Sequence, residues 1–234
     1  MSDKSSLIEK LFQVGAHYAY TKSRRHPTVK PFIFGAKNGT EIFDLEKTSD
    51  LLNTAKEFVK NLGKEKAIIL FVGGKNEAKN AVIKGAEELD MPYVAGRWIG
   101  GTFTNFGEIK KRVEKFTKMK AEQEKGDFAK YTKWERMKLQ EEMDKLERFF
   151  GGIVNMDRLP KAIFAIDPGF EEIAVAEARK SKIPVISLIG SDCDMRLVDY
   201  PIVGNDSAKR SIEYFISEIV SAYTEGKNEA KKSE

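Results

Sequence analysis

The sequence has few of the residues on which redox, metal and nucleophilic chemistry depend. It contains one cysteine, Cys193, and two histidines, His17 and His26, among 234 residues. A single cysteine excludes a disulfide within the chain and is typical of a reducing compartment. The motifs Gly-x-Ser-x-Gly, His-Glu-x-x-His and Cys-x-x-Cys do not occur. The sequence therefore excludes a disulfide scaffold and shows no sign of a hydrolase triad or a zinc-protease site.

Long apolar runs are also missing from the sequence. No segment approaches the ~20 apolar residues that a membrane-spanning helix needs. The first residues, MSDKSSLIEK, lack the continuous apolar stretch of a signal peptide. We therefore expect a cytoplasmic protein without a membrane partner.

The net charge is too small to identify a partner. Lys and Arg number 40 and Asp and Glu number 36, so the formal net charge is +4 at pH 7. An excess of this size does not by itself indicate nucleic acid. Hydrophobic residues make up 41% of the chain, enough for one sizeable core or for a core with an appendage. The positions of the charges along the chain are therefore more informative about partners than their sum.

From residue 67 onward, apolar strands alternate with helices. The expected strands are short and almost wholly apolar, as in a sheet covered on both faces, and lie at 67–72, 93–94, 162–166, 184–189 and 200–203. Helices are expected at 47–62, where Gly63 would cap the helix, and at 76–89, 170–180 and 207–223. This alternation predicts an α/β fold with a five-stranded parallel sheet and right-handed crossovers.

The N-terminal region has a weaker pattern. Residues 1–10 have the apolar spacing of a short amphipathic helix. Glycines and prolines are frequent in 15–40, which predicts a loop with one short strand at 32–34. A second short strand is expected at 41–45.

A charged helical segment at 107–150 interrupts the alternation. Apolar residues repeat there at spacings of three and four in two narrow stripes, Ile109, Val113 and Phe116, then Leu139, Met143, Leu146 and Phe150. The stripes predict an antiparallel helical (coiled-coil) hairpin inserted into the α/β domain. The domain then comprises 1–106 and 151–224, and the polar residues 225–234 are expected to be a disordered tail.

Two strand ends are candidates for a small-molecule or metal site. Residues 72–75 (VGGK) follow an apolar strand, where doubly wound sheets bind ligands. They lack the rest of a phosphate loop or dinucleotide fingerprint, which favours a tight turn. Asp192 and Asp194 could hold a divalent ion if the fold brings His17 close to them. An acidic turn without metal is the simpler interpretation, so we predict no cofactor, metal or catalytic residue.

The distribution of basic residues indicates RNA. Residues 10–40 contain no acid, but they include Lys22, Arg24, Arg25, Lys30 and Lys37, interleaved with Tyr18, Tyr20 and His26. A second acid-free window, 91–107, contains Arg97 and Trp98, and the first hairpin helix adds Lys110, Lys111 and Arg112. Each window alone could be a solvated surface. Three of them in a chain of nearly balanced charge predict a localised basic face that binds RNA.

Within this face, Arg24 and Arg25 are expected to be the principal phosphate-binding element. An extended loop can follow an RNA backbone, and a guanidinium group can bind a phosphate through two hydrogen bonds. The alternative is that both arginines pair with acidic residues of the chain itself. Tyr18 and Tyr20 are candidates for base stacking, and Trp98 is a candidate either for stacking or for an internal anchor.

At these same residues the sequence resembles the small-subunit ribosomal protein S-two family of bacteria, over nearly the whole chain. The matching segments include GAHY at 15–18, KPFIFG at 30–35, DLEKT at 44–48, RWIGG at 97–101, DYPI at 199–202 and GND at 204–206. The resemblance implies a flavodoxin-like sheet with a protruding helical hairpin. It also implies a structural role in the small ribosomal subunit, with small-subunit (16S) rRNA and other small-subunit proteins as partners.

Among those partners, the resemblance implies the messenger-binding protein S-one, where a bacterium has it.

Two departures from the family weaken the metal hypothesis. Tyr20 occupies a place that carries a second histidine in the family, and Gly190, Ser191 and Asp192 replace an Asp-Thr-Asn segment. Both departures leave the RNA-binding prediction unaffected.

Two functions of other classes compete with RNA binding. A nucleotide-dependent enzyme could use the same sheet, but the sequence offers it no nucleophile, base or phosphate cradle. A coiled-coil interaction module could use the sheet as a platform, but it would not require the acid-free segment at 10–40. The sequence therefore predicts a structural RNA-binding protein, with no enzymatic activity and no small-molecule substrate.

Overall fold

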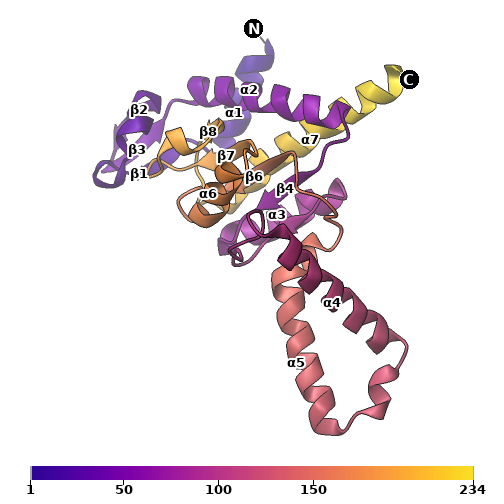
Figure 1. The fold of residues 1–234 in the computed structure, drawn as a ribbon. Coiled ribbons are helices and arrows are strands. Elements are labelled where there is room, and N and C mark those ends of the chain that lie inside the picture. Colours follow the sequence, from indigo (N-terminus) through magenta and orange to yellow (C-terminus); the bar gives the residue numbers. More distant parts are fainter. Residues whose placement is uncertain (1, 234) are drawn as a thin grey trace.

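A five-stranded parallel sheet forms the centre of the computed structural model (Figure 1). The structure describes residues 2–233, with side chains for all of them except 2–5, 129, 232 and 233. The strand order is β5-β4-β6-β7-β8, which comprises β5 (Tyr93–Val94), β4 (Ile69–Val72), β6 (Ala162–Ile166), β7 (Val185–Ile189) and β8 (Tyr200–Val203). This is the order of flavodoxin-like sheets and confirms the predicted fold class.

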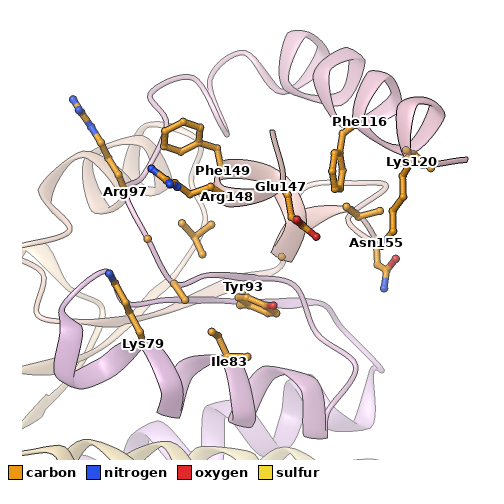
Figure 2. A pocket seen from close by; sticks show the side chains of 17 residues that line it. Lys79, Ile83, Tyr93, Arg97, Phe116, Lys120, Glu147, Arg148, Phe149 and Asn155 are labelled. Carbon is orange, nitrogen blue, oxygen red and sulfur yellow. The ribbon is translucent and has the colours of Figure 1, made fainter. Parts of the chain in front are cut away.

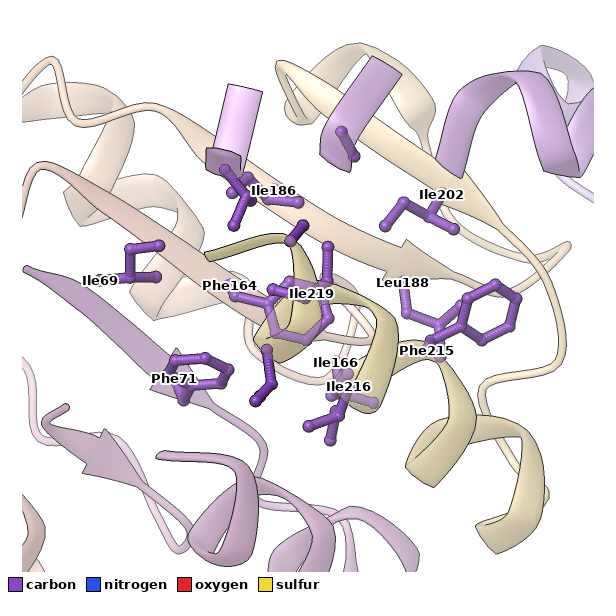
Figure 3. Packing of buried hydrophobic residues seen from close by; sticks show 14 of the residues in the cluster. Ile69, Phe71, Phe164, Ile166, Ile186, Leu188, Ile202, Phe215, Ile216 and Ile219 are labelled. Atoms are coloured by element: carbon purple, nitrogen blue, oxygen red, sulfur yellow. The ribbon is translucent and has the colours of Figure 1, made fainter. Parts of the chain in front are cut away.

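The strands are buried because apolar side chains cover both faces of the sheet. Along β4, Ile69 and Phe71 belong to one core cluster, whereas Leu70 and Val72 belong to another. The first cluster lies under α2 (Leu45–Lys64), α3 (Asn76–Glu88) and α7 (Lys209–Ser233), and Figure 3 shows Phe215, Ile216 and Ile219 of α7 in it. The second lies under α6 (Glu172–Lys180) and the base of the hairpin. Successive side chains of each strand point to opposite faces of the sheet. The sheet is therefore covered on both faces and forms the middle of three layers.

The inserted hairpin projects away from both chain termini (Figure 1). It consists of α4 (Phe106–Glu124), the short helix η3 (Asp127–Lys130) and α5 (Lys133–Phe150). Thr132 begins α5 with a capping box that includes Glu135. A thin apolar seam of Phe116, Met119 and Met143 joins the two long helices. The predicted hairpin is confirmed, including most of its two stripes.

The N-terminal region contains more structure than the sequence indicated. After α1 (Ser2–Gln13), the strands β1 (Tyr18–Thr21), β2 (Ile33–Lys37) and β3 (Thr40–Phe43) form an antiparallel sheet of order β1-β3-β2. Asn38 and Gly39, both with positive φ, form the tight turn between β2 and β3. Two short helices, η1 (Lys22–Arg24) and η2 (Pro27–Phe32), link β1 to β2. The expected loop over 15–40 was therefore wrong for most of residues 18–32, which form β1, η1 and η2.

The C-terminal segment differs from the expected disordered tail, because α7 continues to Ser233. Lys60 and Lys64 of α2 form ion pairs with Glu229 at 2.5 and 3.2 Å. Gly63 and Gly226 lie where a Cβ would overlap backbone atoms of the other helix, so their small size permits the close approach. Gly63 is thus inside α2 and does not cap it. Glu234, also part of the expected tail, lies outside the described residues.

Candidate nucleic-acid interface

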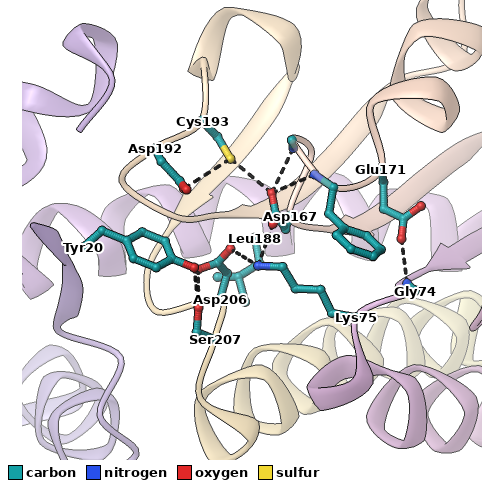
Figure 4. A network of polar contacts seen from close by, with 12 residues as sticks. Tyr20, Gly74, Lys75, Asp167, Glu171, Leu188, Asp192, Cys193, Asp206 and Ser207 are labelled. Carbon is teal, nitrogen blue, oxygen red and sulfur yellow. Dashed lines mark hydrogen bonds and ion pairs between the residues drawn. The ribbon is translucent and has the colours of Figure 1, made fainter. Parts of the chain in front are cut away.

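Side chains that follow the carboxyl ends of four strands of the parallel sheet contact one another in a polar network (Figure 4). Lys75, after β4, contacts Asp167, after β6, at 2.5 Å and Asp206, after β8, at 2.8 Å. The thiol of Cys193, after β7, donates a hydrogen bond to Asp167 at 3.2 Å. Doubly wound sheets bind ligands at this edge. In this structure Lys75, which follows the Gly73–Gly74 turn, is instead paired with two carboxylates of the chain itself.

Burial and pairing determine the protonation of this network. Burial alone would lower the pKa of Lys75, but Asp206 and Asp167 outweigh that effect and raise the pKa. Burial alone would raise the pKa of Asp167, whereas the hydrogen bond from Lys75 lowers it. Burial also raises the pKa of the Cys193 thiol. Neither the ammonium group nor the thiol is a nucleophile at neutral pH.

Glu171 lies beside the network and is 3% exposed. Its carboxyl group accepts a hydrogen bond from the Gly74 N–H at 2.6 Å. Burial, with a smaller contribution from Asp167, raises the pKa of Glu171 from 4.5 to about 7. The pKa of Glu171 is higher in the folded than in the unfolded chain. The contribution of the protonated Glu171 carboxyl to stability is therefore complete below pH 4.5 and is lost as the pH rises through 7.

We expect Glu171→Gln to raise the free energy of unfolding at pH 8 by about 2 kcal/mol more than at pH 5. Glutamine keeps an acceptor oxygen for Gly74 but carries no charge to bury. Urea unfolding at the two pH values measures the difference. Glu172→Gln, at an exposed neighbour, is the control. An effect of Glu171→Gln that is equal at both pH values would contradict the assignment.

The three candidate metal ligands lie in separate environments. His17 is buried between two aromatic rings, and burial lowers its pKa. Asp192 pairs with Arg24, and Asp194 binds the guanidinium group of Arg196 at 2.8 Å. Among the residues that the structure describes, no group of three or more His, Cys, Asp or Glu side chains is arranged to hold a metal ion. The fold does not bring His17, Asp192 and Asp194 together as the metal hypothesis required.

Arg25 forms an internal ion pair. Its Nη1 donates a hydrogen bond to Glu41 Oε1 at 2.6 Å, and the two side chains are 18% and 4% exposed. Glu41 lies in β3, so the pair ties the segment after η1 to the small sheet. The alternative interpretation, pairing with an acid of the same chain, therefore describes Arg25 in this structure.

Arg24 and the neighbouring lysines are exposed. The Arg24 side chain is 58% exposed, contacts Asp192 at 3.1 Å, and lies over the Tyr20 ring at 4.2 Å. An exposed pair of this kind is weak. Lys22, Lys30 and Lys37 are also exposed, and within the described part of the chain they form no ion pair. These four cations remain accessible to a phosphate.

The predicted stacking residues differ in accessibility. Tyr18 is 54% exposed, whereas the hydroxyl of Tyr20 lies 2.5 Å from that of Ser207. Trp98 is 6% exposed, and its ring contacts that of Phe103 edge to face at 5.0 Å. The Trp98 ring is thus enclosed as an internal anchor. Phe34, which the sequence did not single out, is 80% exposed in β2.

A buried carboxylate that the sequence did not reveal holds the loop after Trp98. Glu177 of α6 accepts hydrogen bonds from the N–H groups of Gly101 and Phe103 at 2.6 and 2.9 Å. It also lies 3.5 Å from Trp98 Nε1. Arg97, adjacent to this anchored loop, is exposed. No local pattern links Glu177 to the loop, because the residues are more than seventy positions apart.

Among the described residues, most hairpin cations other than Lys111, Lys115 and Lys138 form no ion pair. Lys111 contacts Glu108 at 2.5 Å, one turn away on the same helix. Lys110 and Arg112 are exposed and form no ion pair among the described residues. The predicted basic residues therefore fall into two groups. Arg25 belongs to a largely buried ion pair, and the other predicted cations are exposed.

Arg97 borders a cleft that was not evident from the sequence (Figure 2). The cleft has a volume of about 860 Å³ and lies between α3, the end of β5 and the base of the hairpin. Lys79, Lys120 and Arg148 also line it. These cations come from separate helices, so only the fold brings them together.

A family model and individual relatives both match nearly the whole chain and point to the same family. Residues 11–226 match the family model of ribosomal protein S2. The small ribosomal subunit protein uS2 of Chloroflexus aggregans is 41% identical over 227 residues, which cover 97% of this chain and 95% of the relative. Its counterpart in Coprothermobacter proteolyticus is 40% identical over 220 residues, with 94% and 82% covered.

These matches include both the parallel sheet and the hairpin, and they confirm the resemblance seen in the sequence. None of the described helices is long and apolar enough to cross a membrane. The matched proteins are ribosomal proteins of the small subunit. The chain belongs to the ribosomal protein S2 family.

Proposed function

We propose that the chain is a structural constituent of the small ribosomal subunit that binds small-subunit rRNA and neighbouring ribosomal proteins, and so supports subunit assembly and translation. The observation that carries the proposal is a set of exposed cations with no ion-pair partner among the described residues. They are Lys22, Lys30, Lys37, Arg97, Lys110 and Arg112. Such cations can exchange condensed counterions of RNA for direct phosphate contacts.

Exposed aromatic rings accompany the cations in the N-terminal sheet. Tyr18 and Phe34 are 54% and 80% exposed, and Arg24 lies on the Tyr20 ring. Proteins that recognise unpaired RNA combine basic side chains with flat rings of this kind. The combination supports RNA as the partner of this surface.

The hairpin tip supports contact with neighbouring proteins. Trp134 and Met137 are 64% and 50% exposed, and Tyr131 is 37% exposed. Exposed large apolar side chains in one segment favour a protein partner. We include the messenger-binding protein S-one among the candidates, as the family resemblance implies.

A salt series separates the two groups of basic residues. We expect a Lys22→Ala, Lys30→Ala and Lys37→Ala triple variant to bind small-subunit rRNA with a log–log salt slope lower by about 2.1–2.7, since each phosphate contact contributes about 0.7–0.9. Its melting temperature should match that of the wild type. Arg25→Ala should keep the slope but lose about 2 kcal/mol of stability, because it leaves the buried Glu41 carboxylate without its hydrogen-bond partner.

Filter binding at several salt concentrations, with thermal melting of each variant, measures both effects. A wild-type chain without salt-dependent affinity for this rRNA would overturn the proposed function. A wild-type slope in the triple variant would instead exclude only the N-terminal lysines from the interface.

A further inference from the structure

The cleft beside the hairpin concentrates unpaired positive charge. Lys79, Arg97, Lys120 and Arg148 line it, against a single acidic residue, Glu147. Within the described part of the chain, none of these four cations forms an ion pair. Lys75 and Arg25, in contrast, have buried carboxylate partners. A cleft with four such cations favours an anionic ligand.

Aromatic rings line the same cleft. Figure 2 shows the half-buried Tyr93 in its middle, with the half-buried Phe149 and the buried Phe116 of the seam on the hairpin side. Gly152 packs so closely on Tyr93 that a Cβ there would overlap both the ring and the carbonyl oxygen. The glycine therefore allows the backbone at the base of the hairpin to pack against Tyr93. Flat rings between cations suit a ligand that alternates aromatic groups with negative charges.

The cleft continues along the carboxyl edge of the sheet. A second hollow of about 500 Å³ shares Lys79, Gly96 and Arg97 with the first. Glu171 and Glu172 also line it, and it extends to Phe170 and Ile173, which are 60% and 56% exposed. Because they share these three residues, the two hollows adjoin, and we call them together the track. Its length suits an extended chain better than a single compact molecule.

We propose that this track binds an unpaired RNA segment. Lys79, Arg97, Lys120 and Arg148 contact its phosphates, and Tyr93 and Phe149 stack on its bases. The inference deepens the proposed function and rests on it. An RNA duplex keeps its bases stacked inside and offers no ring to Tyr93. An acidic peptide would satisfy the cations but would leave both aromatic rings without a stacking partner.

Fluorescence anisotropy with a ten-nucleotide single-stranded RNA containing 4-thiouridine tests the proposal on the full chain. We expect Arg97→Ala with Arg148→Ala to weaken binding at least tenfold and to lower the salt slope by about 1.4, that is 0.7 for each contact to a single strand. Lys161→Ala with Lys180→Ala removes the same charge from exposed positions at the opposite edge of the sheet. This control should bind within twofold of the wild type.

Stacking is tested separately from charge. We expect Phe149→Ala to weaken binding of the oligonucleotide fivefold or more and Phe149→Tyr to restore it, since either ring can stack on a base. Ultraviolet crosslinking should attach the 4-thiouridine to Tyr93 or Phe149. Melting curves of each variant establish that the fold is intact.

Three results would overturn the proposal: equal losses in the cleft variant and its control, crosslinks only outside the track, or preferential binding of decaglutamate over the oligonucleotide. If one of these results occurs while the wild-type chain still binds full-length small-subunit rRNA with a steep salt slope, only the assignment of RNA to the cleft is contradicted. If the wild type fails to bind that rRNA, the proposed function falls with it.

Discussion

Replacing Lys75 by methionine is expected to lower the free energy of unfolding by about 4 kcal/mol. Methionine keeps the unbranched chain, one atom shorter than that of lysine, but leaves two carboxylates without their cation. Asp206 is 1% exposed and Asp167 is 8% exposed, so neither can be rehydrated without opening the sheet edge. Removing one partner of a buried ionic group costs about 3–5 kcal/mol.

Urea unfolding at pH 7 measures this loss, and Lys84→Met, at an exposed lysine on α3, is the control. The loss should be smaller at pH 4, because burial raises the pKa of Asp206 and a protonated carboxyl needs no cation. A loss below 1 kcal/mol at pH 7, or an equal loss in the control, would show that Lys75 does not hold the strand ends together.

Glu177→Gln is expected to cost about 3 kcal/mol, because it places an amide NH₂ against backbone donors that now share the carboxylate. Glu177 Oε2 accepts from the N–H groups of Phe103 and Thr104 at 2.9 and 3.3 Å. Burial alone would raise the pKa of Glu177, but these bonds and that from Gly101 lower it. Its contribution is therefore present above the unfolded pKa of 4.5 and is lost as the pH falls through the folded value.

The Glu177→Gln effect is measured by urea unfolding at pH 7, with Glu172→Gln on the same helix for comparison. Hydrogen exchange should also accelerate at residues 101–104. Stability equal to that of the wild type, or unchanged exchange in this loop, would mean that the buried Trp98 ring alone fixes the loop.

The sheet and the hairpin were predictable because their signals are local. Every residue of Ala162–Ile166 and Val185–Ile189 is buried, and both segments are almost wholly apolar in sequence. The hairpin stripes likewise repeat within single helices. The end of α7 was not predictable from its polar composition, because it is held by ion pairs to Lys60 and Lys64 far away in the sequence.

The candidate interface was predictable only in part. Acid-free windows identified exposed cations such as Lys22 and Lys37, because a local excess of charge has no nearby partner. They could not show that Arg25 pairs with Glu41, since that contact depends on the three-stranded sheet. The cleft was missed for the same reason. Its cations belong to α3, the loop after β5, and the two hairpin helices.

The central claim is that the chain is a structural component of the small ribosomal subunit held by direct contacts with rRNA. The most direct measurement is its incorporation into small subunits assembled without their ribosomal protein S2, followed by hydroxyl-radical footprinting of the rRNA. We predict one copy per particle and rRNA protection that appears only when the chain is present. Particles that fail to retain the chain at physiological salt, or that retain it without any protection of rRNA, would contradict the account.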